Sequence, residues 1–157
     1  MADSARLPVT LSGWLAYIEA LHPKTIEMGL TRVSTVAKRL NLTPSFPIIT
    51  VAGTNGKGST CAMLSQIYIR AGYKVGCYTS PHLIRYNERV KINGLEISDE
   101  SLCEAFSAVE KARGDVALTY FEMGTLAAMW HFLQQKIEVA VLEVGLGGRL
   151  DAVNVFE

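Results

Sequence analysis

The 157-residue sequence lacks long apolar runs and blocks of like charge. No uninterrupted apolar stretch approaches the roughly 18 residues that a membrane-spanning helix needs. The first residues carry no apolar segment of the kind found in signal peptides. Fifteen basic residues balance fifteen acidic ones without clustering, so no surface for nucleic acid is indicated. We therefore expect a cytoplasmic protein with neither a membrane nor a nucleic acid as partner.

Cysteine is also scarce, with three residues and no C-x-x-C pair. Cys61, Cys77 and Cys103 are an odd number, and their spacing supports neither a disulfide framework nor a zinc site. We expect reduced, buried thiols, which agrees with a cytoplasmic location.

Apolar residues make up 49% of the chain and charged residues 19%, which is typical of one globular domain. Apolar residues at helical spacing predict helices near 11–18 and 33–40, the second with Thr31 as its N-cap. The β-branched run 47–52 predicts a strand buried on both faces. A helix is expected after Ser59. Its predicted inward face is formed by Met63, Leu64, Ile67, Tyr68 and Ala71.

The segments that follow complete an α/β pattern. Residues 74–79 predict a second strand, so strand, helix and strand form a parallel unit. Asn93-Gly94 predicts a tight hairpin turn between 90–92 and 95–97. Ser98 is expected to cap a helix, a largely apolar helix should span about 119–135, and 139–142 predicts a third buried strand. The expected fold class is α/β, a parallel-sheet, P-loop-type mononucleotide-binding domain with N-terminal helices.

A glycine-rich segment lies between the first strand and its helix. Its backbone N–H groups, backed by the positive end of the helix, suit phosphate oxygens, and its lysine adds a charge for the terminal phosphates. The segment departs from G-x-x-x-x-G-K-[ST], because Ala52 replaces the first glycine and Gly58 separates lysine from serine. The alternative is a glycine-rich turn with a solvated lysine. The predicted nucleotide-binding residues are Gly53, Thr54, Asn55, Gly56, Lys57, Gly58 and Ser59.

This loop, which reads G-T-N-G-K-G-S, resembles the variant found in the folylpolyglutamate synthase branch of the Mur ligase superfamily. Four further segments agree with that family in order and spacing. They are 22–30, 79–83 with 87–90, 119–122, and 142–154. The resemblance is strongest to the bacterial bifunctional folylpolyglutamate and dihydrofolate synthases, over their N-terminal portion only.

The resemblance implies an ATP site with Mg²⁺, in which Ser80 and Glu143 hold the metal, Lys57 and Glu143 are catalytic, and Asn154 contributes to nucleotide binding. Ser80 and Glu143 each follow a predicted strand, where open α/β sheets place their ligands. A carboxylate that ends a buried strand is costly unless it is paired, and a metal would pair it. The alternatives are an exposed strand end for Glu143 and an ordinary turn for Ser80.

The same resemblance implies a site for the pteroate part of the substrate. Its members would be Met28, Gly29 and Leu30, then Thr119, Tyr120, Phe121 and Glu122, and finally Asp151. Each group has a structural alternative. Met28, Gly29 and Leu30 could form a hydrophobic clasp between helices, Thr119 and Glu122 could form a capping box, and Asp151 could cap a turn. Thr119 and Phe121 rank above Glu122 as contacts.

The implied reaction joins L-glutamate to dihydropteroate or a folate with ATP, through an acyl phosphate. Residues 1–157 would be the N-terminal part of the ATP-binding domain, truncated before the family's C-terminal glutamate-binding domain. We therefore expect this stretch to be inactive alone, and the full-length family form to be monomeric. A generic P-loop nucleotide-binding protein and a non-catalytic remnant are the alternative interpretations.

Overall fold

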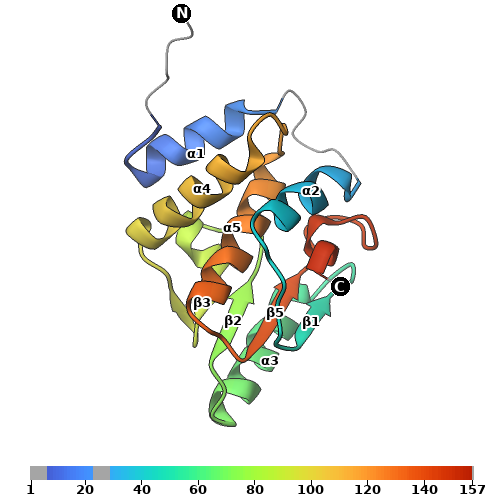
Figure 1. The fold of residues 1–157 in the computed structure, drawn as a ribbon. Coiled ribbons are helices and arrows are strands. Elements are labelled where there is room, and N and C mark those ends of the chain that lie inside the picture. Colours follow the sequence, from blue (N-terminus) through green and yellow to red (C-terminus); the bar gives the residue numbers. More distant parts are fainter. Residues whose placement is uncertain (1–6, 23–28, 157) are drawn as a thin grey trace, which may run out of the picture.

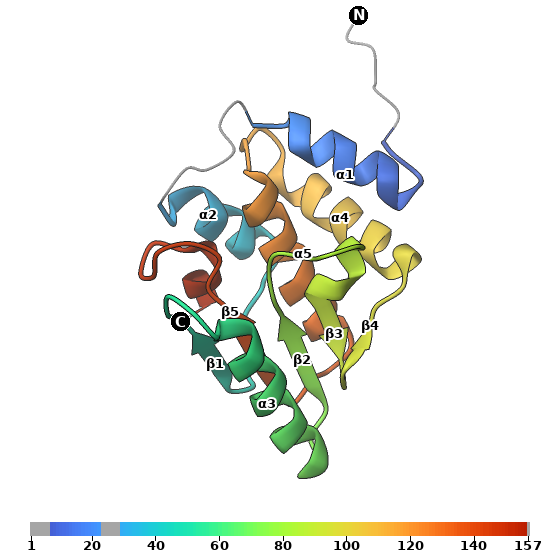
Figure 2. The same cartoon turned by 180° about the vertical axis from the view of Figure 1, so that it is seen from behind.

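The structure is a computed structural model that describes residues 7–22 and 29–156. A five-stranded sheet divides the molecule into two unequal layers (Figures 1 and 2). Among the described residues, four α-helices lie on one face and a single helix, α3, covers the other. The expected α/β class is confirmed.

The sheet has the strand order β1-β5-β2-β3-β4. Its strands are β1 (Ile48–Val51), β2 (Val75–Tyr78), β3 (Val90–Ile92), β4 (Leu95–Glu96) and β5 (Val139–Glu143). The central β5 pairs in parallel with both β1 and β2. The predicted hairpin continues the same sheet, because β3 runs antiparallel to β2 and β4 antiparallel to β3. Asn93 and Gly94 have φ of 50° and 79°, as the predicted turn requires.

β1 differs from its prediction as a strand buried on both faces. Ile48, Ile49 and Val51 are half-buried, and Thr50 is exposed. The physical reason is position, since β1 is an edge strand of the described sheet and has a neighbour on one side only. A β-branched run predicts a strand well but does not tell a central strand from an edge strand.

The thicker layer contains α1 (Leu11–Ala20), α2 (Thr31–Arg39), α4 (Asp99–Arg113) and α5 (Tyr120–Gln134). α5 is buried along most of its length, as its apolar composition predicts. The predicted caps of α4 and α5 are present, since Ser98 accepts a hydrogen bond from the Ser101 N–H and Thr119 accepts one from Glu122. Thr31 is the first residue of α2 rather than its cap. Leu30 stands at the cap position, without a side-chain bond.

α3 (Lys57–Arg70) begins at Lys57, two residues before the serine after which it was expected. Its predicted inward face is partly wrong, because Met63 and Ile67 are 61% and 62% exposed. The buried positions are Cys61 and Ser65, so the contact face is rotated towards small residues. The helix lies close against β2 and β5, where a small side chain fits.

The described part of the chain also contains two short 3₁₀ helices, η1 (Tyr86–Arg89) and η2 (Ala152–Phe156). None of the described helices combines the length and the apolar character needed to cross a bilayer.

Candidate functional site

Three loops leave the carboxyl ends of the parallel strands β1, β2 and β5. Because the strands are parallel and adjacent, these loops meet at one edge of the sheet, where α/β proteins bind their ligands. The loops carry the predicted phosphate segment, Ser80 and Glu143 respectively. Register alone therefore gathers three sequence segments that are far apart in the chain.

The segment after β1 has the backbone of a phosphate-binding loop. Gly56 is in the left-handed region, with φ of 74°, and is the N-cap of α3, so the first turn of the helix opens onto the loop. Residues 52–56 are exposed, which leaves their N–H groups accessible. The Lys57 ammonium donates to the Gly53 carbonyl oxygen at 2.9 Å. Its positive charge thus lies over the loop, where an anion would be attracted.

Glu143 and Ser80 lie next to each other beside this loop. The Glu143 carboxylate accepts a hydrogen bond from the Ser80 N–H at 3.1 Å. Glu143 is 6% exposed and forms no ion pair with any residue of the described ranges. A buried carboxylate without a cation is unfavourable. Both residues line a cavity of about 500 Å³, together with Gly58 at the start of α3.

The donor set at Glu143 and Ser80 suits a hard cation. It offers a carboxylate and a hydroxyl, and within residues 7–22 and 29–156 no group of three His, Cys, Asp or Glu side chains could hold a metal. Zinc sites need three or four such ligands. Mg²⁺ is usually held by one or two protein oxygens together with water and phosphate oxygens. The residues present therefore fit Mg²⁺ delivered with a nucleotide.

Asp151 holds the glycine-rich turn that follows β5. Its carboxylate accepts hydrogen bonds from the N–H groups of Gly145 and Leu146 at 2.9 Å and of Val153 at 3.1 Å, and it is 4% exposed. The Asn154 amide donates to the Gly148 carbonyl at 2.8 Å. Both predicted binding residues thus fix this turn. Its conformation, rather than the Asp151 carboxylate alone, is what they present to a ligand.

The predicted pteroate residues divide between a cap and a second cavity. Thr119 and Glu122 form the capping box, in which the Thr119 N–H donates to Glu122 at 2.9 Å. Glu122 also pairs with Arg32 at 2.8 Å. Both Thr119 and Glu122 are 3% exposed, which leaves little of either for a ligand.

Tyr120 and Phe121, by contrast, line a cavity of about 420 Å³ against α1. Phe121 also packs so closely on Gly145 that a Cβ there would lie 2.7 Å from the ring. This contact joins the cavity to the turn that Asp151 holds. Leu30 and Gly29 are half-buried at the start of α2, and Met28 lies outside the described residues.

Glu88 is an organising residue to which sequence reasoning gave no role. Its carboxylate accepts hydrogen bonds from the N–H groups of Leu83, Ile84 and Arg85 at 2.7–2.8 Å. These three bonds lower its pKa from 4.5 to about 2. They fix the loop after Pro81 and hold two apolar side chains outward, with Leu83 and Ile84 91% and 87% exposed.

The next residue, Arg89, also organises this region. It donates to Nδ1 of His82 at 2.8 Å and lies over the rings of Tyr86 and Tyr120. Burial, and then the nearby charge of Arg89, lower the pKa of His82. No spacing rule predicts either the three hydrogen bonds to Glu88 or the contacts of Arg89, since both depend on how the loop folds back on itself.

No protein-family model matches the chain. Among curated proteins, it is 55% identical over 148 residues to the dihydrofolate synthase/folylpolyglutamate synthase of Escherichia coli K12, covering 94% of this chain and 35% of that protein. It is 40% identical over 137 residues to a folylpolyglutamate synthase of Arabidopsis thaliana, covering 82% and 22%. The chain thus spans about a third or less of the length of these relatives.

Solved structures give the same correspondence. The Escherichia coli enzyme in complex with DHPP and ADP superposes with a TM-score of 0.93 at 54% identity, covering 97% of this chain and 37% of that one. A bifunctional folylpolyglutamate synthase/dihydrofolate synthase with Mn, AMPPNP and L-glutamate bound gives 0.90 at 51%, covering 98% and 37%.

Proposed function

The chain belongs to the dihydrofolate synthase/folylpolyglutamate synthase family, of which it matches the N-terminal third, and from this we propose that it supplies the ATP, magnesium and pteroate sites of a glutamate ligase. The substrates would be ATP, L-glutamate, and dihydropteroate or a folate. The single observation that supports this most strongly is the buried Glu143 carboxylate, bonded to Ser80 N–H without a cation partner among the described residues, in a cavity shared with the start of α3.

In the proposed reaction, a carboxylate oxygen of the acceptor attacks the γ-phosphorus of ATP, and the bond to the β-phosphate oxygen breaks to release ADP. The amine of glutamate then attacks the acyl carbon, loses a proton and displaces phosphate. Phosphoryl transfer of this kind depends mainly on positioning and on neutralising charge. When bound, Mg²⁺ would supply part of that neutralisation.

The residues of this chain have separable parts in that scheme. The N–H groups around Gly56 would bind phosphate oxygens, and the positive end of α3 lies behind them. Lys57 would leave the Gly53 carbonyl, which it contacts at 2.9 Å, for the terminal phosphate. Glu143 and Ser80 would orient the metal. Phe121 offers an aromatic face for a pterin ring, beside the turn that Asp151 and Asn154 fix.

We further propose that the 157 residues alone do not ligate glutamate. The relatives are nearly three times as long, as the 35% coverage implies, and the acceptor and the amine must be held together for the second step. The cytoplasm is the proposed location, supported by three cysteines that all lack a disulfide. We propose that the full-length form is a monomer.

Thermal unfolding with ligands tests this function. Mg-ATP should raise the Tm of the chain, and dihydropteroate should raise it further, because ligands that bind the native state stabilise it by mass action. Glu143→Gln, nearly identical in shape, should abolish the magnesium dependence of the ATP shift. A shift with ATP but none with dihydropteroate would favour a generic nucleotide-binding protein. No shift with either ligand would contradict the proposal.

A further inference from the structure

The cavity beside Glu143 extends well beyond the metal and phosphate region. It continues along one side of α3, past Ala62, Ser65 and Gln66, to Lys91 on β3 and Gly94 in the hairpin turn. The proposed chemistry uses only the end at Gly58, Ser80 and Glu143. The other end of the cavity, formed by Ser65, Gln66, Cys77 and Lys91, is called here the lysine end.

Lys91 is placed in this cavity by strand pairing. It is the register partner of Cys77 on β2, and directly paired residues point to the same face of a sheet. Cys77 faces α3, since it packs in the small core with Cys61. Lys91 therefore lies on the α3 side as well. Burial raises the pKa of the Cys77 thiol, while the neighbouring Ser65 hydroxyl and, after it, the positive charge of Lys91 act in the opposite direction.

The lysine end is rich in unused hydrogen-bond donors. Lys91 is half-buried and makes no hydrogen bond or ion pair with its side chain anywhere in residues 7–22 and 29–156. The Ser65 hydroxyl is 5% exposed, and apart from the Cys77 thiol beside it, it has no hydrogen-bond partner among the same residues. Gln66 lines the same cavity. A thiol is only a weak hydrogen-bond partner for a buried hydroxyl, and the unpaired cation nearby indicates that an anion would complete the site.

We propose that the lysine end binds the α-carboxylate of an acceptor that terminates in a glutamyl residue, while the γ-carboxylate of that residue lies at the Glu143 end. This inference rests on the proposed function, which requires the reacting carboxylate to lie beside the transferred phosphate. Cys77 precedes Ser80 by three residues, of which only Tyr78 continues β2, so the two are at most about 10 Å apart along the chain. The lysine side chain bridges part of that length, and a residue with two carboxylates bridges the rest.

The subsite gives Lys91 a specificity role rather than a catalytic one. A folate presents two carboxylates, whereas dihydropteroate presents only the benzoate that reacts. Lys91 would therefore favour folates without affecting pteroate. A charged hydrogen bond of this kind corresponds to roughly a ten-fold to hundred-fold difference in affinity.

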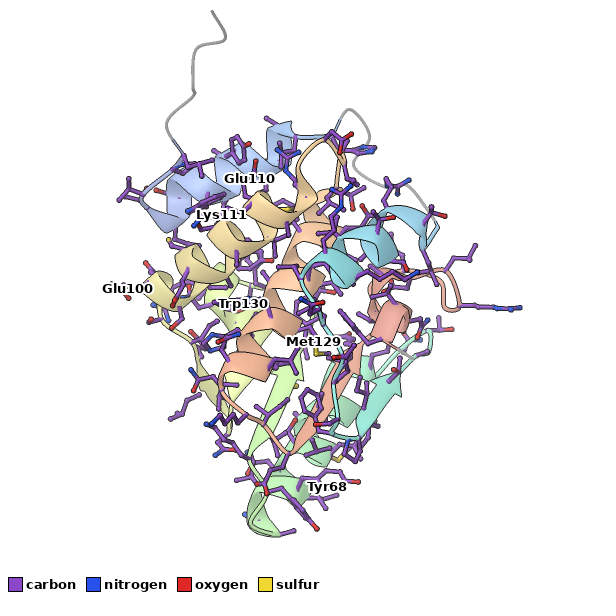
Figure 3. All side chains as sticks on the ribbon, in the orientation of Figure 1. Tyr68, Glu100, Glu110, Lys111, Met129 and Trp130 are labelled. Carbon is purple, nitrogen blue, oxygen red and sulfur yellow. The ribbon has the colours of Figure 1, made fainter. Side chains whose placement is uncertain are left out.

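Isothermal titration of the 157-residue chain with Mg-AMPPNP present tests the subsite. The ligands are folate, pteroate and free L-glutamate. The wild type should bind folate roughly ten-fold or more tightly than pteroate. Lys91→Met should remove that preference and leave pteroate binding unchanged, and Lys91→Arg should keep most of it. Lys111→Met, exposed on α4 at the far end of the molecule from Tyr68 on α3 (Figure 3), is the matched control.

Each result decides one question. Equal binding of folate and pteroate by the wild type, or an undiminished preference in Lys91→Met with an unchanged Tm, overturns the subsite. If Lys91→Met weakens L-glutamate rather than folate, the carboxylate belongs to the incoming amino acid and the acceptor assignment is wrong. Failure of the wild type to bind Mg-AMPPNP contradicts the proposed function itself, which distinguishes the two failures.

Discussion

The two faces of the sheet are built for different purposes. On one face, α5 and its neighbours form a core of 27 buried apolar residues among those that the structure describes, and Met123, Leu126 and Phe132 are fully enclosed. On the other face, α3 and the strands beneath it enclose only five. Most of the buried apolar surface, and with it most of the hydrophobic contribution to stability, therefore lies in the thick layer. The thin layer leaves α3 accessible, as the proposed ligand sites at its first turn and along one of its sides require.

The largest difference in unfolding free energy is expected between two methionine substitutions, one on each face of the sheet. Met129 on α5 (Figure 3) is 1% exposed and Met63 on α3 is 61% exposed. Met129→Ala should lower the free energy of unfolding by about 2–5 kcal/mol, because it leaves a cavity. Met63→Ala should change it by less than about 0.5 kcal/mol. Urea denaturation measures both values, and similar losses of unfolding free energy for the two variants would contradict the difference between the two faces.

A substitution at the start of α3 should weaken ligand binding and leave the stability of the fold almost unchanged. Lys57→Met should weaken Mg-ATP binding by about 1.5–3 kcal/mol, because a charged donor to phosphate is lost. Its ligand-free stability should stay within about 0.5 kcal/mol of the wild type. Isothermal titration and urea denaturation give the two values, with the exposed Lys38→Met on α2 as control. Unaltered ATP affinity would remove the phosphate loop from the binding site.

Substitutions of Thr119 test whether this predicted substrate contact stabilises α5 rather than binding the ligand. Thr119→Ala should destabilise the chain by about 1 kcal/mol, since the N-cap of α5 is lost. Thr119→Ser keeps the hydroxyl and should restore most of that stability. If both variants fold like the wild type but only the alanine variant loses the dihydropteroate shift, the residue is a ligand contact and not a cap.

The smallest effect concerns Glu88, which is on the surface, and its sign follows from the lowered pKa. The carboxylate titrates at about 2 in the folded protein rather than at its ordinary 4.5. Its contribution to stability is therefore complete above about pH 4.5 and is lost as the pH falls towards 2. Melting curves from pH 2 to 6 should show Glu88→Gln differing from the wild type near pH 6 and converging with it near pH 2. A difference in Tm that increases as the pH falls would contradict the stabilising role of the three hydrogen bonds to Glu88.

Much of the fold could be predicted from local signals. The Asn93-Gly94 turn and the Ser98 cap are each contained within a few residues and occur as predicted, and the Thr119–Glu122 box, the structural alternative to a substrate contact, is present as well. The inward face of α3 could not be predicted in the same way. Its apolar residues Met63 and Ile67 suggest one contact face, but the sheet instead packs against Cys61 and Ser65. Hydrophobicity alone underestimates how closely a helix approaches a sheet when its residues are small.

The candidate site, too, could be predicted only in part. The phosphate loop, Ser80 and Glu143 could be placed because each follows a strand, and parallel pairing brings strand ends together. The hydrogen bonds of Asp151 and Asn154 could not be predicted, because a carboxylate or amide after a glycine turn serves a ligand or the turn equally well. Lys91 was not predicted either. Its position depends on pairing with Cys77, which the sequence does not specify.

The Asp151 carboxylate has a consequence for how a ligand would be received. It accepts hydrogen bonds from three backbone groups of the chain itself, so the conformational freedom of residues 145–153 is given up when the chain folds. A pterin arriving beside Phe121 would meet a surface whose shape is settled beforehand. Rigid surfaces of this kind lose little entropy on association, and a small, flat heterocycle can then be bound with few contacts.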